Sequence, residues 1–456
     1  MADDDGLIYV QDFVLESCKI VTGQANPFDF RYMVVEINYF EDIYNACITG
    51  NMVINDTNNF LNGLGFNGTE YLLLTFSKPG MPTKVEKTFR IFKVSNRTLV
   101  KDQNENYVLH FCSEELMLSE QYRVSKSYRG SKISDMVKDV VLNQLKTSPT
   151  KFLDANIEET QGIKDLIIPN LKPFEALSWL STYAISNSSQ TAGSPYLFYE
   201  NLNGYNFRSL QSLFTNKVYN TYNVEVKNLR MPDDPRVQDM SADMTNVLHY
   251  DVLNNFDSIE LINSGAYANR LIAIDPIRQT YSVTNFDYNK YFDTAQKLNK
   301  NGIISNAQNR KGDTVNTTYD AVLKVMTTNT GQSTKNRYIK SHQGNIKDLN
   351  VEMTVPYRTA QIAQINAIKY RVLLPGDPLL TVGSVITFNL PDIRPTDQGR
   401  ELDKYYSGNY LVTAVRHKID QENKFLSLVE LSKESLPTAY DTVDNTLPAW
   451  KDLRSK

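Results

Sequence analysis

The sequence has few cysteines, and it lacks a long apolar run and a recognisable leader. Its three cysteines, Cys18, Cys47 and Cys112, lie far apart and are odd in number, so they form neither a disulfide framework nor a metal-ligand spacing. No run approaches the roughly 18 apolar residues of a membrane span. The acidic start, MADDDGLIYVQDF, lacks the basic and apolar regions of a secretory signal. We expect a protein that folds in a reducing compartment and has no membrane anchor.

Motifs for catalysis and for nucleotide binding are also missing. The chain has no G-x-S-x-G, no Walker-type loop and no H-E-x-x-H. The glycine-rich loop at 62–68 lacks the Lys-Ser/Thr ending of a phosphate cradle, so it is expected to be a mobile or bulged loop. The histidines show no metal-site pattern, and they are His110, His249, His342 and His417. We therefore expect no catalytic, cofactor-binding or metal-binding residues and no cofactor.

Basic charge is not in surplus. Lys and Arg number 48 against 52 Asp and Glu, which gives a net charge of −4. Such a balance does not favour nucleic-acid binding. The basic residues before the predicted helix near 133 are interpreted as a solvated surface, with an anion-binding patch as the less favoured alternative; they are Arg123, Lys126, Arg129 and Lys132.

What is present is β-type patterning, with 27 tyrosines. Five or six short strands separated by turn residues predict an antiparallel barrel or sandwich within residues 1–115. The runs that carry this prediction are 33–40, 46–54, 71–76, 87–94 and 107–112.

Residues 116–222 change to an α+β pattern. Ser131 is a candidate helix cap, followed by an apolar helical face over 133–145. Further along, 165–168 reads as a strand and Pro173 as the start of a helix. Asn203-Gly204 then lies between aromatic runs, which is a strong hairpin signal. The aromatics of this hairpin are expected to pack in a core or at a subunit interface, and a sugar-binding platform is less favoured.

The rest of the chain predicts a second β unit with an interruption. We assign residues 223–275 and 356–436 to this unit, within which a helix is expected to begin near Arg358. Residues 276–355 are polar and weakly periodic, and are interpreted as an insertion with long loops. Residues 437–456 contain two prolines and no period, and are interpreted as a C-terminal arm.

The order of these parts resembles the central baseplate hub protein of contractile-tailed bacteriophages and the related hubs of other contractile injection systems. The resemblance rests on PFEALSWL at 173–180, LLPGDPLLTVG at 373–383 and GNYLVTAVRH at 408–417. It covers roughly residues 8–436, and its motifs are diffuse. Residues 276–355 match no part of that pattern.

The resemblance implies an α+β, mostly β fold with two tube-like antiparallel β-barrel domains separated by an α+β segment. It implies a structural virion protein, not an enzyme: a homotrimeric baseplate hub that adapts a three-fold central spike to a six-fold tail tube. Two similar domains in each of three subunits offer six similar surfaces. In such an assembly the Asn203-Gly204 hairpin is expected to pack in the trimer or against a neighbour. The implied partners are the spike, the tube or its initiator, and other baseplate proteins. The implied location is the virion tail after assembly in the host cytoplasm.

The resemblance also implies a channel through which DNA passes without specific binding. A lumen of neutral or negative potential is expected, because a basic lining would retard the phosphate backbone. Two alternatives stay open at this point. One is a tail-associated peptidoglycan hydrolase that uses a carboxylate pair, and the other is a glycan-binding tail module that uses the aromatic hairpin.

Overall fold

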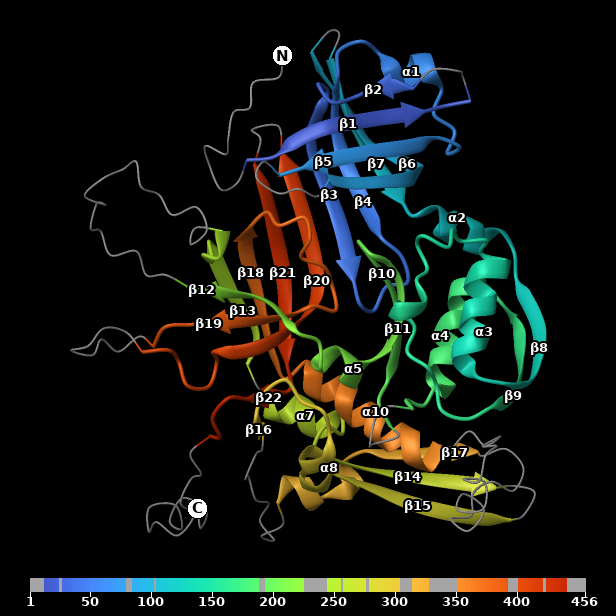
Figure 1. Ribbon diagram of the computed structural model, residues 1–456, viewed down its shortest axis with the longest axis vertical. Helices are drawn as coiled ribbons and strands as arrows, with labels where there is room; N and C mark the ends of the chain where they lie inside the picture. The colour runs from blue at the N-terminus through green and yellow to red at the C-terminus, as the bar shows by residue number, and fades with distance from the viewer. Residues whose placement is uncertain are drawn as a thin grey trace.

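The computed structural model (Figure 1) is elongated, with the N-terminal strands at one end and a small three-stranded sheet at the other. It describes residues 12–23, 27–78, 84–101, 104–187, 193–224, 244–255, 257–275, 279–303, 314–327, 351–392, 401–420 and 424–440. The expected fold class, α+β and mostly β, is confirmed. Among the described residues no helix is both long enough and apolar enough to cross a membrane.

The N-terminal unit is an antiparallel sheet in the order β3-β4-β7-β6-β5-β1-β2. Buried and partly exposed residues alternate along its strands. In β4 every second residue is buried, including Met52 and Ile54, as expected for a sheet that packs one face on a core. A short helix, α1 (Phe60–Leu64), covers the first three residues of the glycine-rich stretch 62–68, which was expected to be a loop throughout. The strands are β1 (Val14–Val21), β2 (Phe28–Asp29), β3 (Val34–Asp42), β4 (Thr49–Asp56), β5 (Tyr71–Ser77), β6 (Lys84–Lys101) and β7 (Asn104–Cys112).

The second β unit has the order β13-β18-β21-β20-β19-β12. Its two outer strands approach each other at one end, where the Asn223 amide donates to the Thr245 carbonyl at 2.9 Å and the Val247 amide donates to the Asn223 carbonyl at 2.9 Å. Aromatic side chains fill its interior. The strands are β12 (Val218–Asn223), β13 (His249–Asn255), β18 (Ile368–Pro375), β19 (Val385–Asn389), β20 (Gly408–Asp420) and β21 (Phe425–Lys433).

Strand β20 joins the two β units into one sheet. Its first half pairs with β19, and its second half pairs antiparallel with β3, from Ala414 opposite Asp42 to Asp420 opposite Glu36. A 13-stranded sheet therefore runs through both units, although the α+β segment separates them in the sequence. Figure 1 shows β20 and β21, in red, alongside β3, in blue. The division of the chain into domains stays a prediction.

The α+β segment lies beside this sheet and contains the hairpin. The predicted strand and Pro173 helix are present, as β9 and α4, and β10 and β11 form the predicted hairpin. Ser131 is not the cap of α3: it ends β8, and Lys132 occupies the N-cap position. The elements of the α+β segment are α2 (Glu114–Gln121), β8 (Val124–Ser131), α3 (Ile133–Asp139), a π-helical turn (Val140–Gln144), a 3-10 turn (Asp154–Asn156), β9 (Lys164–Leu171), α4 (Pro173–Tyr183), β10 (Tyr196–Asn201), β11 (Gly204–Ser209) and α5 (Leu210–Phe214).

The far end of the molecule is more regular than the weak periodicity of 276–355 indicated. Strands β14, β15 and β17 form a separate sheet against α10, which begins at Val351, seven residues before the expected start at Arg358. The elements at this end of the molecule are α7 (Ser258–Asn263), β14 (Ala268–Asp275), β15 (Thr280–Asp287), α8 (Tyr288–Thr294), β16 (Asn301–Gly302), two 3-10 turns (Val315–Thr317 and Tyr319–Ala321), β17 (Leu323–Thr327), α10 (Val351–Ile365) and β22 (Ser435–Leu436).

Candidate functional site: the junction of the three units

Strands β20 and β21 of the second β unit extend into the core of the N-terminal unit. Phe425 of β21 is fully buried, and its ring centre lies 5.9 Å from that of Phe76 and 6.3 Å from that of Phe13, both in the N-terminal unit. The His417 ring of β20 stands 5.6 Å from Phe425 and 5.8 Å from Tyr39. Aromatic pairs at these separations attract beyond their burial alone. Phe425, together with Ile419 of β20, thus completes the core of the N-terminal unit, whereas the second β unit has a core of its own.

Two buried carboxylates at this junction accept hydrogen bonds that link the N-terminal unit to the second β unit and to the hairpin. Glu41 of β3 is 2% exposed, and it accepts hydrogen bonds from the Tyr39 hydroxyl at 2.9 Å and from the Val382 amide at 3.2 Å. The second bond ties the N-terminal unit to the loop before β19. Burial raises the pKa of Glu41 to about 7, because an ionised carboxylate loses its hydration there.

Glu200 makes the corresponding link from the hairpin. It is 3% exposed and accepts from the Ile48 amide at 3.0 Å and from the Ser113 hydroxyl at 2.5 Å. Burial, with the nearby Glu115 charge as a smaller contribution, raises the pKa of Glu200. Glu115 itself is paired with Lys151, at 3.1 Å between Nζ and Oε2. Side chains of β3, β10 and α2 thus bring three carboxylates to one boundary.

These carboxylates were not predicted from the sequence, and their geometry does not suit catalysis. A glycosidase pair must flank a bond of the substrate and leave room for it. Glu41 and Glu200 are almost completely buried and are used by backbone amides. The described part of the chain also holds no group of three or more His, Cys, Asp or Glu side chains placed to bind a metal. The arrangement holds elements together; it does not present reactive groups.

The three described histidines occupy ordinary structural positions. His417 donates to or accepts from the Ser427 hydroxyl at 3.0 Å, and burial lowers its pKa to about 4. His110 lies 2.7 Å from the Ser95 hydroxyl, and His249 is exposed next to Asp251. His342 lies outside the described residues.

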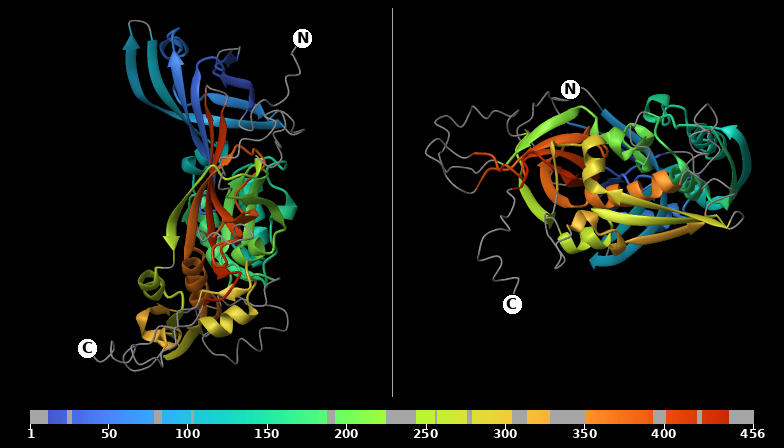
Figure 2. Two further views of the ribbon diagram at one scale, coloured as in Figure 1. Left: turned by 90° about the vertical axis from the view of Figure 1, so that its left-hand side faces the viewer. Right: turned by 90° about the horizontal axis from the view of Figure 1, so that it is seen from below.

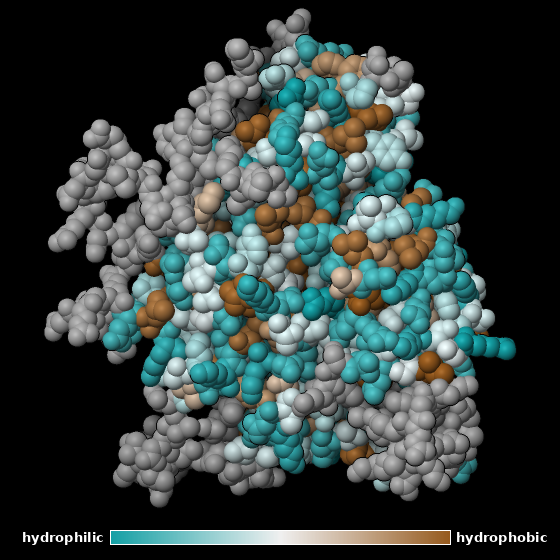
Figure 3. Space-filling view, viewed as in Figure 1, coloured by the Kyte–Doolittle hydropathy of each residue, from teal (hydrophilic) through white to brown (hydrophobic). Residues whose placement is uncertain are grey.

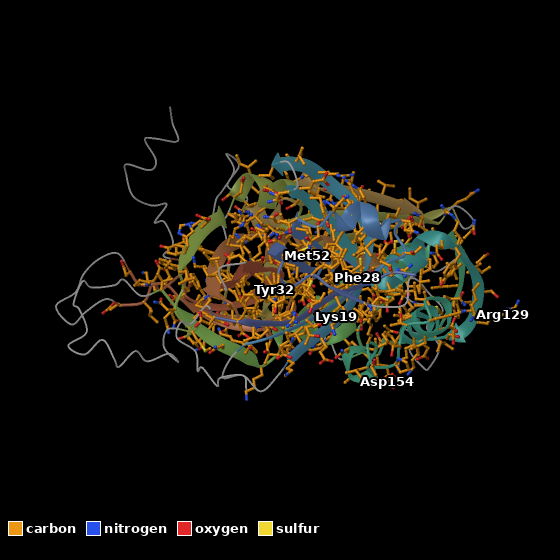
Figure 4. All side chains as sticks on the ribbon, turned by 90° about the horizontal axis from the view of Figure 1, so that it is seen from above. Lys19, Phe28, Tyr32, Met52, Arg129 and Asp154 are labelled. Atoms are coloured by element: carbon orange, nitrogen blue, oxygen red, sulfur yellow. The ribbon has the colours of Figure 1, made fainter. Side chains whose placement is uncertain are left out.

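The basic residues before α3 are spread over an outer edge and are partly neutralised. Lys126 pairs with Asp139 at 2.7 Å, and Lys132 pairs with Glu159. Arg129 projects from the rim of the molecule in Figure 4, far from the central Met52. This arrangement agrees with a solvated surface and gives no anion-binding patch.

The aromatic hairpin is an internal core element of the α+β segment. Phe198 is 7% exposed and stacks on Tyr205, with ring centres 5.5 Å apart, and Phe207 is fully buried against Tyr196 at 4.8 Å. The expectation that these aromatics pack in a trimer or against a neighbour is wrong, because helix α4 and strand β3 of the same chain already cover the hairpin. They also cannot form a sugar-binding platform.

A cavity of about 620 Å³ lies between α4, α7, β17 and α10. The Arg358 guanidinium on its wall donates to the carbonyls of Thr182 and Ala184 at the end of α4. A cation at this end of a helix is favourable, since the last carbonyls have no partner within the helix. Lys324 on the opposite strand donates to the Thr359 hydroxyl at 2.7 Å. Both cations are thus used in joining elements of the fold.

The surface in the view of Figure 1 is predominantly hydrophilic, with apolar residues in small groups (Figure 3). Among the described residues, the most extensive of the features above is the packed junction. The sequence does not predict this junction. A glutamate that will be buried cannot be told from an exposed one by local sequence, and the pairing of β3 with β20 joins residues that are more than 370 positions apart.

Comparisons with known proteins support the tail-protein reading at the level of fold. No family model and no curated protein matches the sequence. The tail protein from Neisseria meningitidis MC58 superposes with a TM-score of 0.50 and 9% identity over 94% of this chain and 100% of that one. The 43 kDa tail protein of prophage MuSo2 from Shewanella oneidensis gives 0.49 and 8% over 92% and 98%.

An Escherichia coli component of the type VI secretion system gives a TM-score of 0.42 and 8% identity, over 94% of this chain and 79% of that one. The expected similarity to phage tail proteins is thus confirmed in three-dimensional structure. At 9% identity the match to the Neisseria protein shows a common fold, and it shows nothing about activity or assembly.

Proposed function

We propose, from the premise that this chain has the fold of a phage tail protein, that it is a structural component of a tail: the homotrimeric hub of a contractile baseplate. In this role the chain connects a three-fold central spike to a six-fold tail tube and leaves a channel for DNA. The observation that carries the proposal is the tail-protein fold along 94% of the chain. In a hub that transmits movement, the two β units of each subunit must stay joined under load, and a sheet that runs through both units meets that requirement.

The symmetry argument supports the same role. Three copies with two β units each present six related surfaces to a tube and three identical surfaces to a spike. The two β units lie in one continuous sheet through β20, so their relative orientation is fixed within each subunit. A fixed orientation is what a regular ring of six surfaces needs. The partners in this proposal are the spike, the tube or tube initiator, and other baseplate proteins, in a virion tail.

We expect the purified full chain to form a three-fold particle, alone or on addition of the spike protein, when its mass is measured in solution. Electron microscopy of that particle should place it at the end of a tail tube. A chain that stays monomeric with both spike and tube proteins present would contradict the hub. The matched control is a spike from an unrelated phage, which should leave the mass unchanged.

The channel gives a second expectation for the same assembly. Since the net charge of each chain is −4, the lumen of the trimer should be neutral or negative, and DNA should pass without specific binding. Measured retention of short duplex DNA by the assembled trimer should be negligible at physiological salt. Tight, salt-sensitive retention would contradict this part of the proposal.

The hydrolase alternative has weaker support. It needs two reachable carboxylates, whereas Glu41 and Glu200 have raised pKa values but lie inside the protein. Zymography on peptidoglycan separates the two functions: we expect no clearing with the full chain. Clearing that disappears in Glu200→Gln while the protein stays folded would favour the hydrolase.

A further inference from the structure

One face of the large sheet is polar and continues from one β unit into the other. Along strands β18, β21, β20, β3, β4 and β7, residues on one side belong to the cores, and the alternate residues point the other way. The left view of Figure 2 shows this sheet nearly edge-on, with the α+β segment, in green, on one side. All six strands are described, unlike the C-terminal arm from residue 441 onward. We call the side away from the cores the polar face, and its charged members are Lys369, Arg371, Arg416, Lys418, Glu36, Asp42, Asp420 and Glu430.

The charges of the polar face balance, since it carries four cations and four carboxylates. Three of the four cations form ion pairs within the face. Lys418 pairs with Glu36 at 3.0 Å, Arg416 pairs with the same carboxylate at 3.5 Å, and Lys369 pairs with Glu430. The fourth cation, on β18, lies opposite Glu430 in the strand register. The face therefore has no surplus of either sign.

Glu36 is the centre of a hydrogen-bonded network on this face. Besides its two ion pairs, it accepts from the Asn38 amide at 2.7 Å. The same amide donates to the Asn51 carbonyl oxygen at 2.9 Å, and Arg416 Nε donates to the Asn38 carbonyl oxygen at 2.8 Å. The donors of these side chains are thus directed along the sheet. Loss of the Glu36 charge would leave two cations without their counter-charge.

The composition of the polar face restricts what can lie against it. On its six strands every large apolar side chain is buried or only partly exposed, and the Arg416 guanidinium lies 5.8 Å from the centre of the Phe40 ring. Protein interfaces have an apolar centre, which this face does not offer. A surface that holds nucleic acid needs a surplus of Lys and Arg to neutralise phosphates, and that surplus is also missing. The face suits a polyanion that slides past without being held.

We propose that the polar face is the wall of the DNA channel in the hub trimer, and that Glu36 keeps this wall from holding DNA. The inference rests on the proposed hub function and names the surface that duplex DNA meets. A channel wall must continue through both β units, because both contribute to the ring. The polar face meets this condition, since it crosses the junction where β3 pairs with β20.

Retention of DNA by the assembled trimer of Glu36→Gln tests this assignment. The probes are a closed circular plasmid and the same plasmid cut once. Glutamine keeps the acceptor for Asn38 but frees Arg416 and Lys418, so the variant should retain the linear form at low salt. The slope of log affinity against log salt should steepen by up to about 5, at about 0.9 for each of six freed cations per trimer. The closed circle cannot enter a closed ring, so it should stay unbound.

The matched control is Glu159→Gln, which removes the same charge and frees Lys132 on the outer edge of the α+β segment. This control should not favour the linear form over the circle. If Glu36→Gln does not assemble, Asn51→Lys adds a cation to the same face without removing an ion pair, and the same result is expected.

Two results would overturn the assignment while leaving the hub intact. One is a trimer of Glu36→Gln and of Asn51→Lys that retains no more linear DNA than the Glu159→Gln trimer. The other is equal retention of the circle and the linear form, because the polar face would then lie on the outside of the particle. A wild-type chain that never forms a trimer contradicts the hub itself, and this inference with it.

Discussion

Phe425→Ala is expected to lower the free energy of unfolding by about 3–5 kcal/mol, the usual cost of truncating a buried phenylalanine. The side chain is fully buried where β21 enters the core of the N-terminal unit, between Phe76 and His417. Gly376 closes over the same ring: a Cβ at this glycine would come within 2.1 Å of Phe425. The cavity left by alanine would lie between rigid sheets that cannot collapse into it.

Urea unfolding of the isolated chain measures this effect, with Phe92→Ala as the control. Phe92 lies on β6 and is 43% exposed, so its truncation should cost far less. Phe425→Leu should fall between the two. If Phe425→Ala and Phe92→Ala have equal effects, β21 does not contribute to the core of the N-terminal unit. If the junction is the main link between the units, Phe425→Ala should also split the transition into two steps.

Glu41→Gln is expected to change how stability depends on pH, by about 3 kcal/mol. The pKa of Glu41 is raised from 4.5 to about 7 by burial, so between these values the folded protein holds a proton that the unfolded chain has released. The stabilisation from this group is complete below pH 4.5 and is lost as the pH rises through 7. A pKa change of that size corresponds to about 3 kcal/mol at 1.36 kcal/mol per unit.

The comparison must use the difference between wild type and variant, because His417 acts in the opposite direction. Its pKa is lowered from 6.5 to about 4, so its contribution is lost as the pH falls through that range. Glutamine can still accept the bonds from Tyr39 and Val382. We expect the stability advantage of wild type over Glu41→Gln to decline by about 3 kcal/mol from pH 4.5 to 7.5. The control Glu86→Gln, exposed on β6, should show no such decline, and a constant difference for Glu41 would contradict its burial in the folded chain.

Much of the local structure could be predicted from the sequence, because its signals are local. Pro173 begins α4, Asn203-Gly204 lies at the turn of the β10-β11 hairpin, and alternation identifies the strands of both β units. Ser131 shows the limit of such signals: it has the right chemistry for a cap, but it is the last residue of β8, and Lys132 is the N-cap of α3, which begins at Ile133. Boundaries depend on pairing with β9, which the local sequence does not encode.

The candidate site could not be predicted, because burial and long-range pairing create it. Glu41 sits in an alternating strand like many surface glutamates, and only its contact with the Val382 amide makes it a link between units. The aromatic residues Phe198 and Phe207 carried a clear signal for a hairpin but none for what covers it. Within residues 276–355, the described strands β15 and β17 gave weak periodicity because they are half exposed, with apolar residues on the face that points away from α10.

The pairing of β3 with β20 also has a consequence for folding during translation, because β3 is synthesised long before its partner. The partner of Asp42 is Ala414, so a ribosome must add 372 residues before this edge of the N-terminal unit can be closed. At about 5–20 residues per second this takes roughly 20–75 s. During that time β3 presents unpaired amides and carbonyls, which are a template for pairing with another chain. Production of this protein should therefore be most prone to aggregation on the nascent chain, and early termination upstream of β20 should yield an N-terminal unit that self-associates through β3.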